Sequence, residues 1–538
     1  MSFQRSHNSG TYDTKIILDD ALVMATNALY GEPCVGEVSP ISGRPCVEID
    51  FFDPEYLRGN FTQDTRDFLF ATDFGKTTYQ QDSFDAYITG DMFDLPAGPV
   101  AAAYGVAYQA DEIQDTPGEQ TRQGNAWGSS SAGITAGSSY TRAIYGEIQI
   151  PVVQDLPFME SFDITASGRW TDVNVYGDDT TYKLAFNWQI GGGFRLRGSR
   201  GTSFRAPSLY ELYLADQTGF PAQQSIDPCF DWGSRADEGT INPTVAQNCA
   251  ADGIPTDYPA GGTESATEFI SGNSESLVAE TSTSEGIGVV YTSLDNRFGA
   301  SVDYYDVTIN GQIAQIGAAD VLDLCYTSDD FPNDPFCELF TRHDGSTSAP
   351  EFSVAEVYTG YQNIASQRIR GVDTVLTYTD ELPFGQLRMR LSHTTQFERT
   401  VQQLPTSPAE DNVGLLGNPK HSGTLNTTLV RDDWSFNWAM NYFSKVDNYS
   451  EYEAGNRTSY RDTPATFVAD APTTFYHSFS ATRNFDQFDV TLGVANAFDK
   501  TPPRGSRNNS GRIVGNSRLY SQYDNLGRRI FANVTYTF

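Results

Sequence analysis

The feature that most constrains this chain is a period-two alternation of apolar and polar residues, which recurs along its length. Clear examples are residues 162–170, 182–189, 387–392, 434–442 and 530–538. Trp434, Phe436 and Trp438, for instance, are separated by Ser435 and Asn437. Successive side chains of a β-strand point to opposite sides, so each stretch predicts a strand with one apolar and one polar face.

We expect roughly sixteen strands of about 8 to 15 residues, a length that fits strands crossing a bilayer on a tilt. Soluble sandwiches usually have shorter strands and shorter loops. Alternation alone does not show which face of the strands contacts water and which contacts lipid or a packed core. A ring of about sixteen strands, however, encloses a lumen too wide for side chains to fill, so the apolar face must contact lipid. The sequence has no run of about 18 apolar residues, which excludes a helical membrane protein.

Short and long connections alternate between the expected strands. The long ones are residues 204–282, 310–362, 398–419, 443–475 and 499–527. Outer-membrane barrels have short periplasmic turns and long extracellular loops. The sequence therefore predicts an all-β fold, a transmembrane antiparallel β-barrel over residues 67–538, preceded by a loop-rich segment of the barrel at 1–66.

The charge balance narrows the function. The chain has 35 Lys and Arg against 69 Asp and Glu, a formal net charge of −34. This excludes a nucleic-acid partner, because neutralising phosphates requires clustered basic residues. Aromatic residues make up 13% of the chain, which is too many for a disordered acidic protein.

Six cysteines fall into three local pairs, Cys34/Cys46, Cys229/Cys249 and Cys325/Cys337. None has the CxxC spacing of a zinc or redox motif, and no histidine lies near enough to complete a metal site. We predict three short-range disulfides that close long loops, which implies an oxidising compartment. The alternative is six unrelated thiols.

An oxygen-rich cluster surrounds Cys337 and consists of Asp329, Asp330, Asn333, Asp334 and Glu338. Calcium binds clusters of this kind. This one lacks the spacing of a calcium-binding loop, so we favour a hydrated disulfide loop and predict no metal site and no cofactor.

Three segments carry a distinctive pattern. The first, GSRGTSFRAPSLYELY at 198–213, contains Gly201, Thr202, Phe204, Arg205, Ala206, Pro207, Leu209, Glu211, Leu212 and Tyr213. The second, at 272–286, contains Gly272, Asn273, Leu277 and Glu280. The third, at 494–538, contains Asn496, Phe498, Gly527, Arg528 and the terminal Phe538. Together they resemble the β-barrel domain of TonB-dependent outer-membrane receptors, and residues 84–108 resemble a mid-barrel hairpin of that family.

The resemblance has departures. Ala279 stands where the family has proline. Receptors of this family have a signal peptide, a TonB box, an N-terminal plug and ~22 strands, and we find neither plug, box nor signal before residue 67. We therefore expect the C-terminal part of a longer receptor. About six strands would be missing, which would leave an open sheet with two unpaired edges or a smaller barrel without a plug.

The resemblance implies an integral protein of the Gram-negative outer membrane that captures a scarce nutrient for TonB-dependent uptake, of the siderophore–iron or oligosaccharide class. Its expected partners are outer-membrane lipid, the barrel assembly machinery, which the terminal Phe538 would engage, and the TonB complex if a plug and a box are supplied. Between Phe204 and Ser282 the sequence has 12 Asp and Glu against Arg205 and Arg235. Such a loop would repel anionic ferric siderophores.

Aromatic residues in or near this loop could stack on a sugar or an aromatic chelate, and these are Tyr210, Tyr213, Phe220, Phe230 and Trp232. We expect no enzyme, because the five histidines are scattered and neither a G-x-S-x-G motif nor a phosphate-binding loop is present. Two other functions remain open. One is a passive porin-like channel, and the other is a secreted carbohydrate-binding or adhesive β-protein.

Overall fold

The computed structural model describes residues 1–259, 265–346, 349–404, 407–448, 459–460, 463–464, 467–506 and 513–537. Within these residues, sixteen long strands form one antiparallel sheet in which each strand pairs with its neighbours in the chain. They are β1 (Ser2–Ile17), β2 (Phe70–Leu95), β3 (Gly98–Thr116), β4 (Thr135–Leu156), β5 (Met159–Val173), β6 (Gly177–Gly191), β7 (Phe194–Arg205), β10 (Glu280–Thr292), β11 (Phe298–Ile316), β13 (Val354–Leu382), β14 (Gly385–Gln402), β16 (His421–Arg431), β17 (Trp434–Phe443), β22 (Thr474–Phe485), β23 (Phe488–Ala495) and β26 (Arg529–Tyr536).

Shorter elements lie in the connections. The short strands are β8 (Gln217–Gly219), β9 (Thr267–Ser271), β12 (Phe340–Arg342), β15 (Glu410–Asp411), β18 (Val446–Asp447), β19 (Ser459–Tyr460), β20 (Thr463–Pro464), β21 (Asp470–Ala471), β24 (Ile513–Val514) and β25 (Ser517–Arg518). The helices are α1 (Asp19–Leu29), α2 (Pro54–Leu57), α3 (Gln63–Leu69), α4 (Glu119–Arg122), α5 (Leu209–Tyr213), α6 (Gln223–Ile226), α7 (Trp232–Asp237), α8 (Pro243–Ala251), α9 (Ala318–Thr327) and the 3₁₀ helix η1 (Pro335–Leu339).

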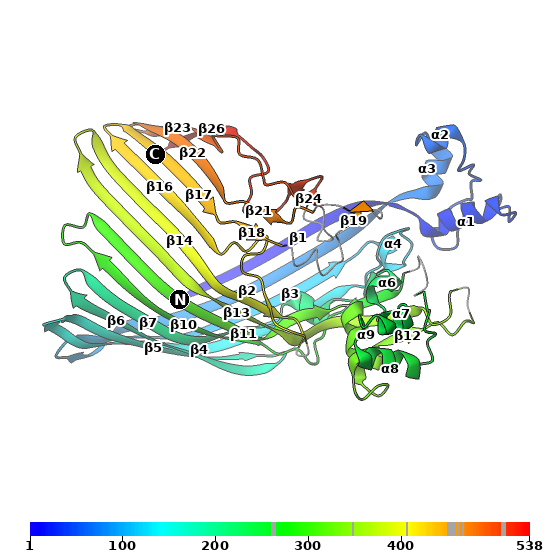
Figure 1. Ribbon diagram of the computed structural model, residues 1–538, viewed down its shortest axis with the longest axis horizontal. Helices are drawn as coiled ribbons and strands as arrows, with labels where there is room; N and C mark the ends of the chain where they lie inside the picture. Colours follow the sequence, from blue (N-terminus) through cyan, green and yellow to red (C-terminus); the bar gives the residue numbers. More distant parts are fainter. Residues whose placement is uncertain are drawn as a thin grey trace.

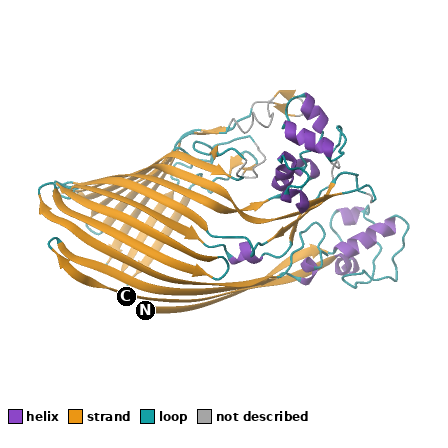
Figure 2. Ribbon diagram, turned by 90° about the horizontal axis from the view of Figure 1, so that it is seen from below, coloured by secondary structure: helices purple, strands orange, loops and turns teal. Residues whose placement is uncertain are grey.

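The helices gather at one end of the sheet, and both chain termini lie toward the other end (Figures 1 and 2). The tight turns share the end without helices, for example residues 383–384 and 432–433, except for the short connection 174–176, which lies at the loop end. Asp432 and Asp486 take positive φ values of 49° and 59°, which two-residue hairpin turns require. The alternation of short turns and long loops expected from the sequence is confirmed.

The register places apolar residues of neighbouring strands on a common face. Leu391 of β14 lies opposite Leu425 of β16, which lies opposite Met440 of β17. This face is uncovered: Trp434 and Phe436 are 40% and 45% exposed, as expected for residues that contact lipid rather than a packed core. The opposite face is polar and lines the inside of the curved sheet.

The sheet is open. β1 pairs with β2 and β26 pairs with β23, and no ladder joins β1 to β26 among the described residues. The prediction of about sixteen antiparallel strands that form part of a barrel is confirmed. The strands form a sheet whose two edge strands are β1 and β26.

Two expectations about the elements were wrong. Residues 1–66 were expected to be rich in loops; residues 18–66 do form part of a long connection with short helices, but residues 2–17 form the 16-residue strand β1. The strands were also expected to have at most about 15 residues, whereas β2 and β13 have 26 and 29. In β1 and in the first half of β2 the backbone pairing continues through residues that are mostly polar on both faces, so alternation does not mark them. β13 instead extends into a loop core in which Val354 and Val357 are buried.

The buried cores lie in the loops. One cluster joins α6, α8, α9 and the start of β13 through residues such as Val245, Leu322 and Val357. A second packs α1 and α3 around Leu18 and Phe68. No helix in the described ranges combines the length and the hydropathy of a membrane span.

Candidate functional site

The polar face of the first four strands carries tyrosines that are paired with aspartates. Tyr79 of β2 donates a hydrogen bond to Asp111 of β3 over 2.7 Å, and Tyr145 of β4 donates to Asp85 of β2 over 3.0 Å. The hydroxyl of Tyr12 in β1 donates to the Asp115 carboxylate of β3 over 3.4 Å. These pairs line the inside of the sheet with phenol rings and carboxylates.

Two of these tyrosines reach across an intervening strand because that strand has a glycine beneath the ring. A Cβ on Gly75 would lie 2.2 Å from the Tyr12 ring, and one on Gly105 would lie 2.2 Å from the Tyr145 ring. Sequence reasoning missed the pairs. Tyr12 and Asp115 are 103 residues apart, so only the strand register brings them together.

The lining continues toward the loops through Tyr210 of α5. Its side chain is 43% exposed. Burial, and then the negative charge of Asp115, raise the pKa of the Tyr210 phenol, so its hydroxyl keeps its proton at neutral pH. A neutral phenol can donate a hydrogen bond to a ligand oxygen. The carboxylates beside the phenols attract positive charge and repel anions.

Arg169 of β5 lies over the Tyr145 ring at 5.3 Å, and further basic residues line another part of the polar face. Arg197 of β7 makes a two-point contact with Asp303 of β11, with both distances 2.8 Å. Arg195 and Asp373 line the same hollow, which has a volume of about 630 Å³. The polar face therefore divides into a tyrosine–carboxylate side on β1–β4 and a side with both charges on β7, β11 and β13.

The first motif segment ties the loop end of the sheet together. Arg205 at the end of β7 contacts Glu211 of α5 at 2.9 and 3.0 Å and Glu280 of β10 at 2.6 Å. Glu280 also accepts from the backbone N–H of Ile313. Ser208 caps α5 and exchanges hydrogen bonds with Glu211, so the helix begins with a capping box. The Arg205 contacts hold this first turn against the strand.

Apolar residues of the two motif segments pack under this ion-pair cluster. Leu209, Leu212 and Leu277 are buried together with Ile313. A Cβ on Gly272 would lie 2.6 Å from the backbone of Leu212, so only glycine allows this approach.

The remaining motif residues are also placed by backbone contacts. The Tyr213 hydroxyl donates to the carbonyl of Ser138, and the backbone N–H of Asn273 donates to the carbonyl of Glu211. Gly201 and Thr202 lie in the β7 ladder, and Ala206 and Pro207 follow its end. Phe204 faces Thr281 on the apolar side. The motif therefore positions the start of the longest loop; a ligand-binding role for it stays a prediction.

The C-terminal motif residues shape the last loop. Asn496 is 2% exposed and its side chain bonds both the N–H and the carbonyl of Lys500. The N–H of Arg528 donates to Asp499 beside Gly527, which has a φ of +73°. Phe498 is 68% exposed and lies edge-on to His477 on the apolar side. Phe538 lies outside the described residues.

The β7–β10 and β11–β13 connections, both long, fold together into one body at the mouth of the sheet. We name this body the cap; it comprises residues 206–259, 265–279 and the described part of 317–353. Its centre is the ion pair of Arg342 with Asp227, at 2.6 and 2.8 Å, whose side chains are 10% and 0% exposed. Burying two charges is stable only with such complete pairing.

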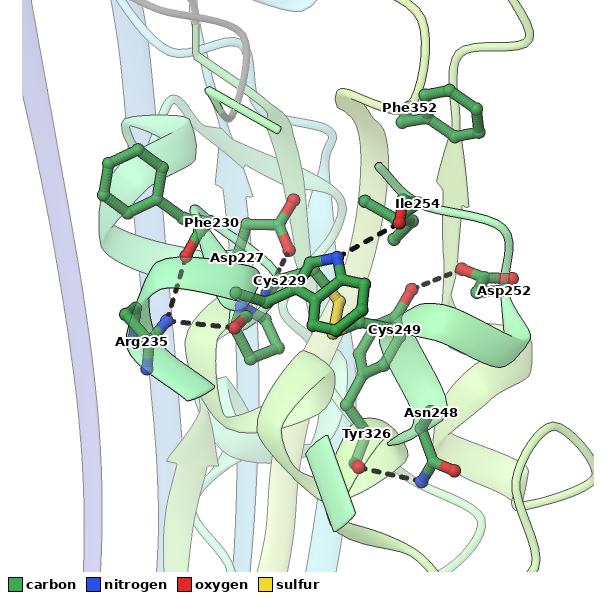
Figure 3. Close-up of a disulfide and its surroundings, with 12 residues drawn as sticks. Asp227, Cys229, Phe230, Arg235, Asn248, Cys249, Asp252, Ile254, Tyr326 and Phe352 are labelled. Carbon is green, nitrogen blue, oxygen red and sulfur yellow. Dashed lines mark hydrogen bonds between the residues drawn. A yellow bond between two sulfur atoms is a disulfide. The ribbon is translucent and has the colours of Figure 1, made fainter. Parts of the chain in front are cut away.

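Disulfides close the cap. Cys229 is joined to Cys249 and Cys325 to Cys337, and a third disulfide joins Cys34 to Cys46 in the β1–β2 loop. Figure 3 shows how the cap is linked around Cys229–Cys249: Tyr326 donates to Asp252, and Asn248 donates to the carbonyl of Tyr326. Because Tyr326 comes from the other long loop, these bonds join the two loops.

The cap explains part of the acidity noted in the sequence. Asp227, Glu211 and Glu280 are neutralised by arginines, and Glu268 accepts from the N–H of Ala318. Asp237, Glu238 and Asp257 stay on the exposed surface. The loop end therefore remains acidic toward solvent, although fewer charges are free than the sequence suggests.

The expected aromatic contacts of this loop are partly structural. The Trp232 indole N–H donates to the carbonyl of Ile254, and Phe230 packs on the core of the cap. Phe220 is 54% exposed and remains available together with Tyr210. Near Cys337, Asp334 accepts from Ser328 and from the N–H of Phe336. Within the described ranges, no group of three or more metal-ligating side chains is assembled.

Comparison with known proteins gives one family and a set of similar folds. The family model described as "TonB dependent receptor-like, beta-barrel" matches residues 47–497. Among solved structures, the siderophore receptor PirA from Acinetobacter baumannii matches with a TM-score of 0.53 and 14% identity, over 100% of this chain and 60% of that chain.

A mutant of the ferric enterobactin receptor PfeA from Pseudomonas aeruginosa, in complex with enterobactin, matches with a TM-score of 0.55 and 15% identity, over 100% of this chain and 59% of that chain. This chain thus spans about 60% of the length of the structures that it resembles. At these identities the likeness concerns the fold.

Proposed function

Because the chain belongs to the TonB-dependent receptor-like β-barrel family, we propose that it forms the barrel of an outer-membrane receptor for TonB-dependent uptake of a siderophore–iron complex. Members of this family are integral outer-membrane receptors rather than enzymes. The observation that carries the proposal is the tyrosine and carboxylate lining beneath a disulfide-closed cap. Such a lining, at the mouth of a wide polar lumen, is suited to capturing a hydroxyl-rich or amide-rich solute.

The similar folds support the siderophore class. PirA is called a siderophore receptor, and PfeA a ferric enterobactin receptor. The charges of this chain favour a particular kind of complex. With Asp85, Asp111 and Asp115 on β2 and β3 and an acidic exposed cap, a neutral or cationic ferric complex would be attracted and a strongly anionic one repelled.

The partners follow from the same proposal. Lipid surrounds the apolar face, and the barrel assembly machinery inserts the strands. Energised uptake additionally requires a plug and a TonB box, so the TonB complex acts on this barrel when those parts are supplied.

Growth under iron limitation tests the proposal. A host that lacks the gene is complemented with the native gene or with Tyr210→Ala, and is supplied with neutral, cationic or anionic ferric chelates. We expect rescue by the native gene on a neutral or cationic chelate, and reduced rescue by Tyr210→Ala. Tyr30→Ala is the control, because Tyr30 is 85% exposed at the end of α1.

Three results would contradict the proposal. If growth depends on the gene only when an oligosaccharide is supplied, the transported nutrient is a carbohydrate and not a siderophore–iron complex. Uptake that persists without TonB would indicate a passive channel. Recovery of the protein from the medium instead of the outer membrane would indicate a secreted adhesive protein.

A further inference from the structure

Strand β11 contains a β-bulge at Asn310 and Gly311, which form the only Asn–Gly pair in the sequence. Asn310 is the last residue of β11 that pairs with β10, where it lies opposite Thr281. On the other side, the ladder to β13 passes from Ile309 directly to Gln312. Gly311 therefore has no ladder partner among the described residues of either neighbouring strand.

The side chain of Asn310 is free to move. It is exposed, and it makes no hydrogen bond or ion pair with any residue that the structure describes. The space around Gly311 is also open, since the nearest atom to a Cβ built there would be the Cβ of Asn363, at 3.8 Å. Gly311 has a φ of +59° and no side chain of its own, so its backbone nitrogen is uncrowded.

These two neighbours have the groups for an intramolecular reaction. When the N–H of Gly311 loses its proton, its nitrogen attacks the side-chain amide carbon of Asn310. A new C–N bond closes a cyclic imide, the C–N bond of the side-chain amide breaks, and the amide nitrogen leaves as ammonia. Water then opens the imide at either of its two carbonyl carbons, which gives aspartate or isoaspartate. Overall, one water is consumed and one ammonia is released.

We propose that Asn310 is a site of spontaneous deamidation in the folded protein, and that its isoaspartate product loosens the joint between the sheet and the cap. In isoaspartate the chain runs through the former side chain, so the backbone gains one carbon before Gly311. A bulge accommodates this extra atom more readily than a paired stretch of the ladder does.

The joint is a set of hydrogen bonds around Asn363 of β13. Its side-chain nitrogen donates to the carbonyl of Gly311 over 2.8 Å and to the carbonyl of Val278 over 2.9 Å. Its side-chain oxygen accepts from the N–H of Val278 over 2.9 Å. One amide thus connects β11 and β13 with a residue of the cap. Lengthening the backbone at residue 310 moves the Gly311 carbonyl away from Asn363, so this connection is weakened.

Other asparagines of the sheet serve as internal controls. Asn426 of β16 is paired on both sides, with Arg390 and with Ala439, and it is followed by Thr427. Asn363 is followed by Ile364. A branched side chain on the following residue hinders the attack of its nitrogen, so neither asparagine should react.

The test incubates the purified full chain, folded in detergent, at mildly alkaline pH and follows its peptides by mass spectrometry. Electron-transfer dissociation distinguishes isoaspartate from aspartate. We expect isoaspartate to accumulate at residue 310 and to form faster at higher pH, because the attacking nitrogen must first lose its proton. Asn426 and Asn363 should stay intact. The variants Asn310→Gln and Asn310→Ser should both lose the product, and the same chain unfolded in denaturant gives the rate without tertiary structure.

Hydrogen exchange in residues 277–280 measures the effect on the joint. Exchange there should be faster in the aged native chain than in the fresh one, and unchanged by ageing in Asn310→Gln. Fresh Asn310→Asp is the matched control, because it adds the negative charge without lengthening the backbone, and it should exchange like the fresh native chain.

The proposal is overturned if residue 310 reacts only in the unfolded chain, because the folded sheet would then protect it. It is also overturned if ageing leaves exchange in 277–280 unchanged, or if fresh Asn310→Asp exchanges as fast as the aged native chain, since charge would then be the cause. Circular dichroism verifies that each variant keeps its sheet. Nutrient uptake does not enter these measurements, so their outcome is independent of the proposed transport function.

Discussion

At the scale of single residues, the site depends on polar groups that are satisfied by partners from distant strands. Arg205 joins α5 to β10 through Glu211 and Glu280, and Arg342 joins the two loops of the cap through Asp227. Removing one partner leaves the other charge without compensation in a partly or fully buried place, which costs more than the pair itself contributes. These residues therefore determine whether the loop end is ordered.

Glu211 makes this order depend on pH. Burial alone would raise the pKa of its carboxyl, but hydrogen bonds from Arg205 and Ser208 outweigh burial and lower it below the ordinary value of 4.5. The stabilisation is present above that value and is lost as pH falls through the lower pKa of the folded state. We expect the protection factors for hydrogen exchange in 208–214, which correct for the intrinsic pH dependence of exchange, to decrease in the native chain as the pH falls below about 4.5.

In the variant Glu211→Gln, the local unfolding free energy of residues 208–214 should be about 1 kcal/mol lower at neutral pH, so these amides exchange faster. The pH dependence of this free energy should also be lost. Glu275→Gln, in the exposed part of the same loop, serves as the control and should behave like the native chain. An unchanged pH dependence in Glu211→Gln would show that another group controls the opening.

At the scale of elements, the cap is a small domain built from two loops. Its core contains Leu322 of α9 and Val245 of α8 and packs against Val357 at the start of β13, and two disulfides close it. Its helices have at most ten residues, too few to be stable alone, so packing and disulfides hold them. The cap can therefore unfold locally while the sheet persists.

The double variant Cys229→Ser/Cys249→Ser tests this separation. The disulfide closes a loop with a sequence separation of 20 residues. Its loss should lower the local unfolding free energy of the cap by about 3 kcal/mol and leave exchange in β14 and β16 unchanged. Hydrogen exchange with mass spectrometry resolves the two regions. Cys34→Ser/Cys46→Ser should affect only the β1–β2 loop, and loss of protection throughout the sheet would show that cap and sheet unfold as one unit.

At the scale of the whole molecule, the sheet separates an apolar face from a polar one. Neighbouring residues test which face contacts lipid, because their side chains point to opposite sides: Leu425 lies opposite Leu391, and Thr424 opposite Ser392. We expect Leu425→Arg to destabilise the protein folded into lipid vesicles by about 2–4 kcal/mol. Thr424→Arg should change stability much less. Denaturant titration in vesicles measures both, and a larger effect at Thr424 would reverse the assignment of the faces.

The edges of the sheet belong to the same scale. β1 and β26 each present backbone groups that have no strand partner among the described residues. Inside a bilayer such groups require partners, because hydrocarbon offers no hydrogen bonds. In the membrane, further strands or contact between the two edges must therefore complete the sheet.

The sequence by itself determined the strands in which one face is apolar, the alternation of short turns and long loops, and the local cysteine pairs. All of these are properties of neighbouring residues, because side-chain direction alternates along a strand and turn residues act locally. It did not reveal β1, whose residues are polar on both faces and whose place follows from its register on β2. The short helices of the cap were also missed, because a helix of a few residues shows no clear helical period.

Only the tertiary structure decided which distant residues meet. The strand register brings Tyr12 to Asp115 and places Gly198 beside Arg200 in the lining of one groove. The packing of the loops brings Arg342 to Asp227. Charges and rings are visible in a sequence, but their partners are set by hydrogen-bonded ladders that join segments up to about a hundred residues apart. The fold class therefore follows from local pattern, whereas the binding surfaces follow from register.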